Sequence, residues 1–262
     1  MFELKGMIVQ KSKISKSSDN LFLYLIPIIE VITFLYKTLD VLVIETFEFE
    51  EAYLPNDPIQ KIFDNSLSQY LTAFMQGFSL SVFAFGASEA GKTQTIEGNA
   101  KEPGLILMFS DALFNVMENK KYHTNNAQGQ IDNFSYNIRV RYVEILDEEI
   151  KDLLPGGQHE GLTVVNNEWE GPTILGANWV SVKNAVELKD LLVKSQKNRT
   201  IASNEFGKLT YKSTGYFTIE LIQNTELANR KESIFMVSRL NFLDLPGNFH
   251  ANLSSHYILN RL

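Results

Sequence analysis

Residues 80–98 read Leu-Ser-Val-Phe-Ala-Phe-Gly-Ala-Ser-Glu-Ala-Gly-Lys-Thr-Gln-Thr-Ile-Glu-Gly, and this stretch decides how the rest of the chain is interpreted. An apolar run of strand length leads directly into the pattern G-x-x-x-x-G-K-T, which is typical of a phosphate-binding loop between a strand and a helix. We therefore predict that nucleotide phosphates bind here. The loop consists of Gly86, Ala87, Ser88, Glu89, Ala90, Gly91, Lys92 and Thr93.

Each residue type in the loop has its own chemical purpose. Gly86 and Gly91 let the backbone turn tightly, so that successive N–H groups face one concavity. Lys92 adds a positive charge for the β- and γ-phosphates, and the Thr93 hydroxyl can bind the accompanying Mg²⁺. The Glu89 carboxylate is harmless to a phosphate only if it faces solvent. The alternative is a glycine-rich turn in which Lys-Thr follows by accident.

Length and composition indicate one large α/β domain. The chain has 262 residues, of which 44% are hydrophobic, and such a chain can bury a sizeable core. Its formal charge is −7, and no basic patch stands out, so neither nucleic acid nor a membrane is expected as a partner. The absence of cysteine excludes disulfides and thiolate metal sites.

The N-terminal part is read as a polar segment followed by a buried strand. Residues 1–20 are polar, and residues 21–29 form an apolar run. This order superficially resembles a signal peptide, but no small-residue cleavage site follows, and Glu30 and Lys37 interrupt the run before it could span a bilayer. A strand over 21–29 is therefore preferred to a membrane role. A second short apolar run, 41–44, precedes an acidic stretch over 45–51.

A core helix is predicted between Asp57 and Gly77. Asp57 is the expected N-cap, Pro58 the first helical residue and Gly77 the end. The apolar residues recur at helical spacing: Ile59, Ile62, Phe63, Leu67, Tyr70, Leu71 and Phe74.

Beyond the loop, the pattern alternates between helices and strands. We predict helices over 105–118, 147–154 and from an Asn184 cap to 197, and strands over 134–146, 162–165, 179–182, 216–223 and 233–243. Residues 120–132 are expected to be an exposed loop, and residues 166–176 to be rich in turns. The last strand ends in Asp244-Leu-Pro-Gly247. A D-x-x-G at a strand end can supply a second carboxylate to the Mg²⁺ sphere and a γ-phosphate sensor, although an ordinary strand-end turn is the alternative.

Four segments, in this order, resemble the kinesin motor domain family. Residues 82–98 are similar to its strand, its loop G-Q-T-G-S-G-K-T and the following T-M-x-G, and residues 141–154 to its segment V-S-Y-x-E-I-Y-N-E-x-I-x-D-L-L. Asn198, Arg199 and Ala202 match the helix that leads into switch I, and residues 244–247 match the D-L-A-G of switch II. The resemblance covers residues 47–247.

The resemblance implies a P-loop NTPase fold of α/β class, with a central mostly parallel or mixed sheet and helices on both faces. It implies a polar segment over residues 1–20 and a motor domain over residues 21–262 that is incomplete at its C-terminus. It further implies ATP or ADP with Mg²⁺ as cofactors, with Thr93 and Asp244 on the metal side. Microtubules or their associated proteins would be the partners, in a cytoplasmic, cytoskeletal location.

The departures from the family fall on its two switches. Placed without gaps from Asn198, the switch I pattern N-x-x-S-S-R-S-H falls on Gly207, Thr210, Tyr211, Lys212, Ser213 and Thr214. Its second serine, which in kinesins helps hold the Mg²⁺ shell and the attacking water, is here Tyr211. The switch I arginine is Lys212, and the glutamate that pairs with it after Gly247 is Phe249. Lysine cannot make the planar fork of arginine. The R-x-R-P motif of the family's first strand keeps only Pro27.

These departures lead to the hypothesis of a nucleotide-binding motor domain that hydrolyses poorly. Such a domain would serve as a structural or assembly component of a microtubule-based structure, a cilium being one example. Its attachment to microtubules would be indirect, because residues 166–173 carry two carboxylates and no basic residue, with Trp169 as one candidate anchor. The alternative is an active ATP-dependent motor seen as a fragment. A small P-loop kinase or GTPase is a third reading, but no N-K-x-D motif or acceptor lid is visible.

Overall fold

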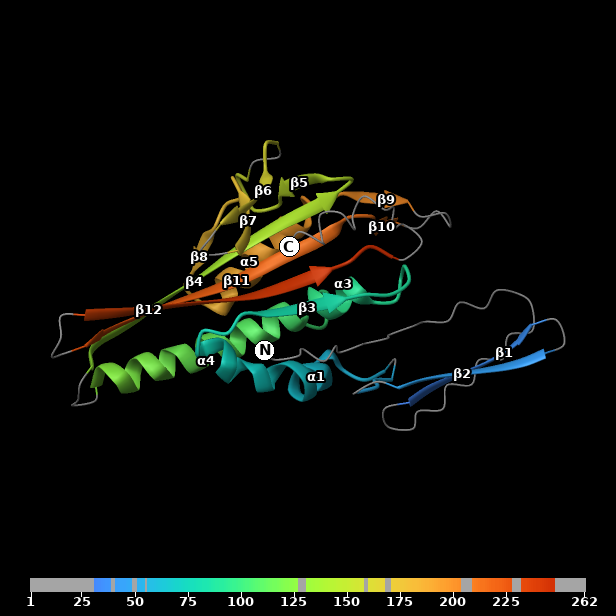
Figure 1. Cartoon of the computed structure of the whole chain (residues 1–262), viewed down its shortest axis with the longest axis horizontal. Coiled ribbons are helices and arrows are strands. Elements are labelled where there is room, and N and C mark those ends of the chain that lie inside the picture. The colour runs from blue at the N-terminus through green and yellow to red at the C-terminus, as the bar shows by residue number, and fades with distance from the viewer. Residues whose placement is uncertain are drawn as a thin grey trace.

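A six-stranded mixed sheet forms the centre of the molecule (Figure 1). The computed structural model describes residues 31–38, 41–48, 51–54, 56–126, 131–157, 160–167, 171–203, 209–227 and 232–247. The strand order is β3-β12-β11-β4-β5, with β8 also paired to β4. The strands are β3 (Leu80–Ala84), β4 (Ile131–Leu146), β5 (Glu149–Asp152), β8 (Val180–Val182), β11 (Thr214–Leu227) and β12 (Glu232–Asp244).

The pairing of β3 with β12 brings the two sequence motifs together. These strands are parallel, and Asp244 at the end of β12 lies opposite Ala84 at the end of β3. The phosphate loop and the D-x-x-G segment therefore leave the sheet side by side. The other pairings in this sheet are antiparallel. The mixed sheet expected from the sequence is confirmed, with antiparallel neighbours outnumbering parallel ones.

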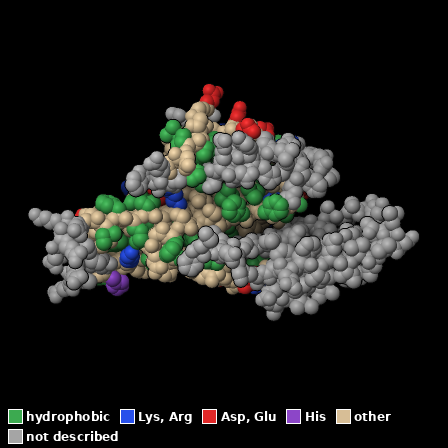
Figure 2. All heavy atoms as spheres, in the orientation of Figure 1, with side chains coloured by type: hydrophobic (Ala, Val, Ile, Leu, Met, Phe, Trp, Pro, Cys, Tyr) green, Lys and Arg blue, Asp and Glu red, His purple; other side chains and the backbone are tan. Residues whose placement is uncertain are grey.

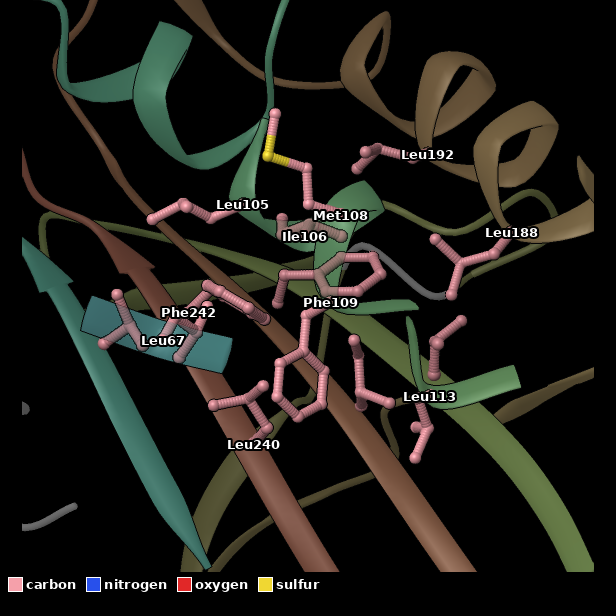
Figure 3. Packing of buried hydrophobic residues seen from close by; sticks show 14 of the residues in the cluster. Leu67, Leu105, Ile106, Met108, Phe109, Leu113, Leu188, Leu192, Leu240 and Phe242 are labelled. Atoms are coloured by element: carbon pink, nitrogen blue, oxygen red, sulfur yellow. The ribbon is translucent and has the colours of Figure 1, made fainter. Parts of the chain in front are cut away.

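The helices of the described residues pack on one face of this sheet and enclose the larger core. A continuous helical stretch runs through α1 (Ile59–Ile62), a π-turn at Phe63–Leu67, a 3-10 turn at Ser68–Tyr70 and α2 (Leu71–Met75). It is joined by α3 (Lys92–Ile96), α4 (Leu105–Asn126) and α5 (Ala185–Gln196). Figure 3 shows Phe109 and Leu113 of α4 packed between the sheet residues Leu240 and Phe242 and the α5 residues Leu188 and Leu192.

The opposite face carries a smaller apolar cluster. Val143, Tyr216 and Leu243 from the sheet pack there with Leu162 and Ile174. Ile174 belongs to a hairpin of β6 (Thr163–Asn167) and β7 (Gly171–Leu175). Among the described residues, this hairpin covers the second face where the sequence predicted helices. No helix in the described part of the chain is long and apolar enough to cross a bilayer.

The predicted core helix is confirmed, but its first turn is capped differently. The N-cap is Pro58, whose side chain makes no capping bond, and Asp57 instead accepts a hydrogen bond from the Leu54 amide at 2.9 Å. The amide of Ile59, at the start of the helix, donates to the Glu102 carboxylate at 2.6 Å. A residue distant in the sequence therefore does the capping that Asp57 was expected to do. Gly77 ends the helix with φ of 96°, as predicted.

Two predicted segments have a different structure. Residues 120–126 continue α4 instead of forming a loop, and Lys120 in this last part of the helix donates to the Gln223 side chain of the sheet at 2.7 Å. Residues 147–154 form a hairpin instead of a helix. Asp147 and Glu148 adopt φ of 48° and 69°, as a two-residue turn between antiparallel strands requires, and β5 follows.

The remaining expectations have mixed outcomes. Asn184 caps α5 by accepting from the Glu187 amide, as predicted. The turn-rich stretch 166–176 contains β7, which the sequence analysis missed. Two further hairpins are formed by β1 (Val31–Thr38) with β2 (Val41–Glu48), and by β9 (Ile201–Ser203) with β10 (Leu209–Tyr211). The predicted strand over 21–29, Trp169 and Phe249 lie outside the described residues.

Candidate nucleotide site

The phosphate loop has the backbone conformation that its glycines allow. Gly86 and Gly91 adopt φ of 147° and 88°, a region that residues with side chains rarely enter. Glu89 also has positive φ, at 65°, and its side chain is exposed. Although exposed, Glu89 also belongs to the lining of the cavity beside the loop.

Lys92 closes the loop from its helical end. Its Nζ donates to the carbonyls of Gly86 at 3.1 Å and Ala87 at 2.7 Å. Burial lowers the pKa of Lys92, and Arg199 adds to this effect, whereas Asp244 opposes it. A partly desolvated ammonium at this position favours an anion, because an incoming phosphate restores the compensating charge.

Thr93 and Asp244, predicted from separate motifs, are in direct contact. The Thr93 hydroxyl donates to Asp244 Oδ2 at 2.6 Å. Asp244 is 2% exposed, and its other oxygen, Oδ1, is buried without a hydrogen-bond partner. A buried carboxylate oxygen beside a hydroxyl is a donor set that suits Mg²⁺, so the two residues fit the expected cation. They would hold it, and the bound ion would neutralise phosphate charge.

Arg199 is the residue that joins the site into one network. Its guanidinium donates to Asp244 Oδ2 at 2.7 Å, to Glu97 Oε1 at 3.1 Å and to the Ser213 carbonyl at 3.0 Å. Burial alone would lower the pKa of Arg199, but Tyr142, Asp244 and Glu97 raise it above the ordinary arginine value. The cation is therefore permanent, and it fixes Asp244 beside Thr93.

Glu97 is the second buried anion of the network. Besides Arg199, it accepts hydrogen bonds from the Tyr142 hydroxyl and from the Gln196 amide, the latter at 2.8 Å. Burial raises the pKa of Glu97, and Arg199 opposes that rise. The side chain thus connects α3, β4 and α5 beneath the nucleotide site.

A second carboxylate, Glu144, anchors the start of the switch I segment. It accepts from the Thr200 amide and hydroxyl, each at 2.8 Å, and from the Ser213 hydroxyl at 2.5 Å. Because Thr200 and Ser213 both donate to Glu144, both ends of the described switch I residues are attached to the same strand, β4.

Some of the predicted switch residues lie at the cavity beside the loop, and others do not. Thr210 and Tyr211 line the cavity beside the loop, and the Tyr211 ring lies 4.1 Å from the Arg199 guanidinium carbon. Lys212 is exposed. Gly247 approaches the loop so closely that a Cβ there would lie 2.0 Å from Ser88 Oγ.

These residues surround a cavity of about 330 Å³. The cations of Lys92 and Arg199 and the hydroxyl of Thr93 line it together with the Asp244 carboxylate, so it can accept a phosphate group together with a cation. The lining consists of Glu89, Gly91, Lys92, Thr93, Gln94, Arg199, Ile201, Thr210, Tyr211, Asp244, Leu245 and Gly247.

Sequence reasoning did not assign roles to Arg199, Glu97 and Glu144. A signal was present only for Glu144, which lies between apolar residues of a predicted strand, where an unpaired charge would be costly. What the sequence could not supply was the pairing. Arg199 and Asp244 are 45 residues apart, and Arg199 and Glu97 are 102 residues apart.

The comparisons with known proteins agree on one family. The family model for the kinesin motor domain matches residues 37–257. Kinesin-related protein 1 of Dictyostelium discoideum is 29% identical over 217 residues, which are 79% of this chain and 10% of that protein. Kinesin-like protein 5 of Schizosaccharomyces pombe is 26% identical over 78% of this chain and 22% of its own length. The chain thus spans between a tenth and a quarter of these relatives.

The fold resembles a solved motor structure. A KIF14 fragment, in a dimer described as bound to AMP-PNP and a microtubule, superimposes with a TM-score of 0.78. The match covers 94% of this chain and 69% of that one, at 22% sequence identity. An ADP-bound KIF14 fragment, also in complex with a microtubule, gives a TM-score of 0.76.

Proposed function

The chain belongs to the kinesin motor domain family, and on that premise we propose that it binds ATP or ADP with Mg²⁺ at residues 86–93 but hydrolyses ATP slowly or not at all. Binding is supported by the loop geometry, by the partly desolvated Lys92 ammonium and by the contact between Thr93 and Asp244. The relatives' solved structures contain AMP-PNP or ADP, in agreement with this ligand class.

The observation that carries the second half of the proposal is the position of Tyr211. Its ring is packed against Arg199 and lines the cavity, where the family pattern places a serine. Burial raises the pKa of Tyr211, so the phenol stays protonated at neutral pH. A serine hydroxyl close to the backbone can position a water, whereas a bulky ring at the same site occupies the space. A positioned nucleophile typically contributes a hundredfold or more to the rate.

Lys212 is exposed in the structure, and its family counterpart is the arginine of the switch pair. The proposed counterpart of the glutamate is Phe249. With neither an arginine fork nor a carboxylate in that pair, closure of the switches over the γ-phosphate would lose its electrostatic driving force.

Binding is tested by thermal unfolding with and without Mg·ATP. A ligand at a hundredfold excess over its Kd stabilises the folded state by about 2.7 kcal/mol, so the wild type should melt several degrees higher. Lys92→Ala is expected to abolish this rise. Lys189→Ala removes the same charge from an exposed position on α5 and should leave the rise intact. No rise for the wild type at millimolar Mg·ATP would refute nucleotide binding.

An active ATP-dependent motor is the second candidate, and one observation favours it. The Thr93, Asp244 and Arg199 constellation is complete, so the metal side of the site is not degenerate. Steady-state phosphate release separates the two candidates, because the proposal expects little turnover even with saturating Mg·ATP. Turnover of several molecules per second would favour the motor.

For the cellular role, we propose a structural or assembly component of a microtubule-based structure, with a cilium as one example. Attachment would be through a partner protein. The support is the acidic formal charge of −7, which has the same sign as the microtubule surface.

A further inference from the structure

One wall of the cavity beside the phosphate loop is an aromatic ring. Tyr211 is the last residue of β10, and its ring lies 4.1 Å from the guanidinium carbon of Arg199. Both residues line the cavity together with Thr93 and Asp244. Arg199 is 3% exposed, and the attraction between an aromatic ring and a cation is stronger when the cation is desolvated. The stacked ring therefore belongs to the resting shape of the site.

The edge of the Arg199 guanidinium is occupied by the protein itself. Its Nε donates to Ser213 Oγ at 3.4 Å. Its Nη1 donates to the carboxylates of Glu97 and Asp244, at 3.1 and 2.7 Å, and its Nη2 to the carbonyls of Ser213 and Asp244, at 3.0 and 3.4 Å. Every nitrogen of this guanidinium thus has an acceptor in the chain. Arg199 fixes Asp244 and supports the Tyr211 ring, but it offers little to a phosphate.

The charges that line the cavity balance one another. Among the described lining residues, Lys92 and Arg199 are cations, and Glu89 and Asp244 are carboxylates. Figure 2 shows acidic side chains gathered where β5 and β6 lie, and basic ones only at scattered positions among the described residues of this face. Each further phosphate group adds negative charge to a ligand. A longer phosphate chain therefore gains less here than in a site with surplus positive charge.

The side on which a third phosphate enters follows from the residues that would hold the cation. Thr93 donates to Asp244 Oδ2 at 2.6 Å, and the same oxygen accepts from Arg199 at 2.7 Å. The Tyr211 ring is stacked on that arginine. In phosphate-loop proteins the cation bridges the β- and γ-phosphates. A γ-phosphate must therefore lie on the side of the cavity where Asp244 and the Tyr211 ring are found.

The D-x-x-G segment is packed tightly against the phosphate loop. A Cβ on Gly247 would lie 2.0 Å from Ser88 Oγ and 2.6 Å from the Ser88 nitrogen. Widening the cavity on this side would break that close contact. Room for a γ-phosphate would then come from displacement of Tyr211, which would uncover the buried Arg199 cation. The α- and β-phosphates require no such displacement, because they bind the backbone of the loop.

We propose that Tyr211 is a specificity residue that makes this site selective for a nucleoside diphosphate over the corresponding triphosphate. The inference rests on the nucleotide binding proposed above and concerns the same site. The diphosphate binds the loop and Lys92 with the ring in place, whereas the γ-phosphate has to move the ring away from Arg199. The family pattern has a serine at this position, so the ring is a property of this chain.

The test is isothermal titration calorimetry of the full chain with Mg·ADP and with Mg·AMP-PNP, an ATP analogue that is not hydrolysed. The wild type should bind ADP more tightly by about tenfold or more. In Tyr211→Ser, we expect the affinity for AMP-PNP to rise until the two ligands differ by less than about threefold, with little change for ADP. Tyr211→Phe keeps the ring and should keep the ratio of the wild type.

Tyr122→Ser is the matched control, because it makes the same substitution at a position on α4 that is 68% exposed. It should leave both affinities unchanged. The ratio for the wild type requires no variant, so the proposal stays testable even if Tyr211→Ser folds poorly.

Two results would overturn the selectivity while leaving nucleotide binding in place. One is equal affinity of the wild type for both ligands. The other is an equal loss of both ligands in Tyr211→Ser, since this would mean that the ring only supports the fold. Binding of neither ligand by the wild type at millimolar concentration would refute the proposed nucleotide binding itself, and the selectivity with it.

Discussion

Arg199 is the residue on which the site depends most. Its guanidinium carries three of the contacts that fix the site, to Asp244, to Glu97 and to the Ser213 carbonyl, and it is 3% exposed. Losing it would leave two buried carboxylates without their cation, and breaking a buried pair in this way typically costs about 3–5 kcal/mol. Gly215 is part of the same constraint, because a Cβ there would lie 2.9 Å from the guanidinium.

The first prediction at this scale concerns Glu97 and pH. Burial raises its pKa above the ordinary 4.5, so between 4.5 and the raised value the folded state binds more protons than the unfolded state. The stability of the wild type should therefore fall as pH rises through that window. Glu97→Gln cannot titrate and should lack this fall. Urea unfolding between pH 4.5 and 8 measures the difference, with the exposed Glu149→Gln as control. Parallel stability curves for wild type and Glu97→Gln would contradict the prediction.

The second prediction concerns the switches. Lys212→Arg alone lacks a carboxylate to pair with, and Phe249→Glu alone would meet only a lysine, so neither single change should restore turnover. Groups that act as a unit are strongly non-additive. We expect ATP hydrolysis to appear only when both changes are combined with Tyr211→Ser, as measured by steady-state phosphate release. Recovery of turnover by one single variant would show that the pair does not act as a unit.

Among the elements, the short connection from α3 to α4 determines how β3 and the phosphate loop are joined to the helices that pack on the sheet. Gly98 and Gly104 face each other there, and a Cβ on Gly98 would lie 2.3 Å from the Gly104 nitrogen. Gly98 also pairs with Pro103 in an isolated bridge, and Glu102 caps the start of α1 from the same connection. One tight turn thus joins three helices.

The prediction at this scale compares two glycines. Gly98 and Gly156 adopt φ of 84° and 77°, but a Cβ at Gly156 would meet nothing within 4 Å. Gly156→Ala should therefore cost only backbone strain, about 1 kcal/mol, whereas Gly98→Ala adds a collision with backbone and should cost about 3 kcal/mol in total. Chemical unfolding of both variants measures the difference. Equal costs would mean that the connection can widen without penalty.

At the scale of the whole molecule, the net charge influences which partners can approach. The chain has 31 acidic and 24 basic residues, so its formal charge is −7. At physiological salt the screening length is about 8 Å, so the net charge repels a second acidic surface only at short range.

The prediction at this scale is that the isolated chain does not bind the outer microtubule wall tightly. In co-sedimentation at micromolar tubulin, most of the chain should stay in the supernatant, with or without nucleotide. A chain in which Glu226→Lys and Glu149→Lys reduce the negative charge serves as a comparison for purely electrostatic effects. Micromolar binding of the wild type that weakens with added salt is the result that would refute the prediction.

The sequence by itself determined the elements whose signal is local. The phosphate loop, its strand, the Asn184 cap and the long strands of the sheet follow from spacing, glycine positions and side-chain alternation, which depend on neighbours in the chain. Family resemblance then supplied the order of the motifs and the departures at Tyr211 and Lys212.

Only the tertiary structure decided the features that depend on distant contacts. Residues 147–154 were predicted to be helical but complete a hairpin because β4 offers its edge, and the contact of Lys120 on α4 with Gln223 joins residues 103 positions apart. The contact of Thr93 with Asp244 depends on the register of β3 against β12. Register is set by the packing of both sheet faces together, and no local pattern contains it.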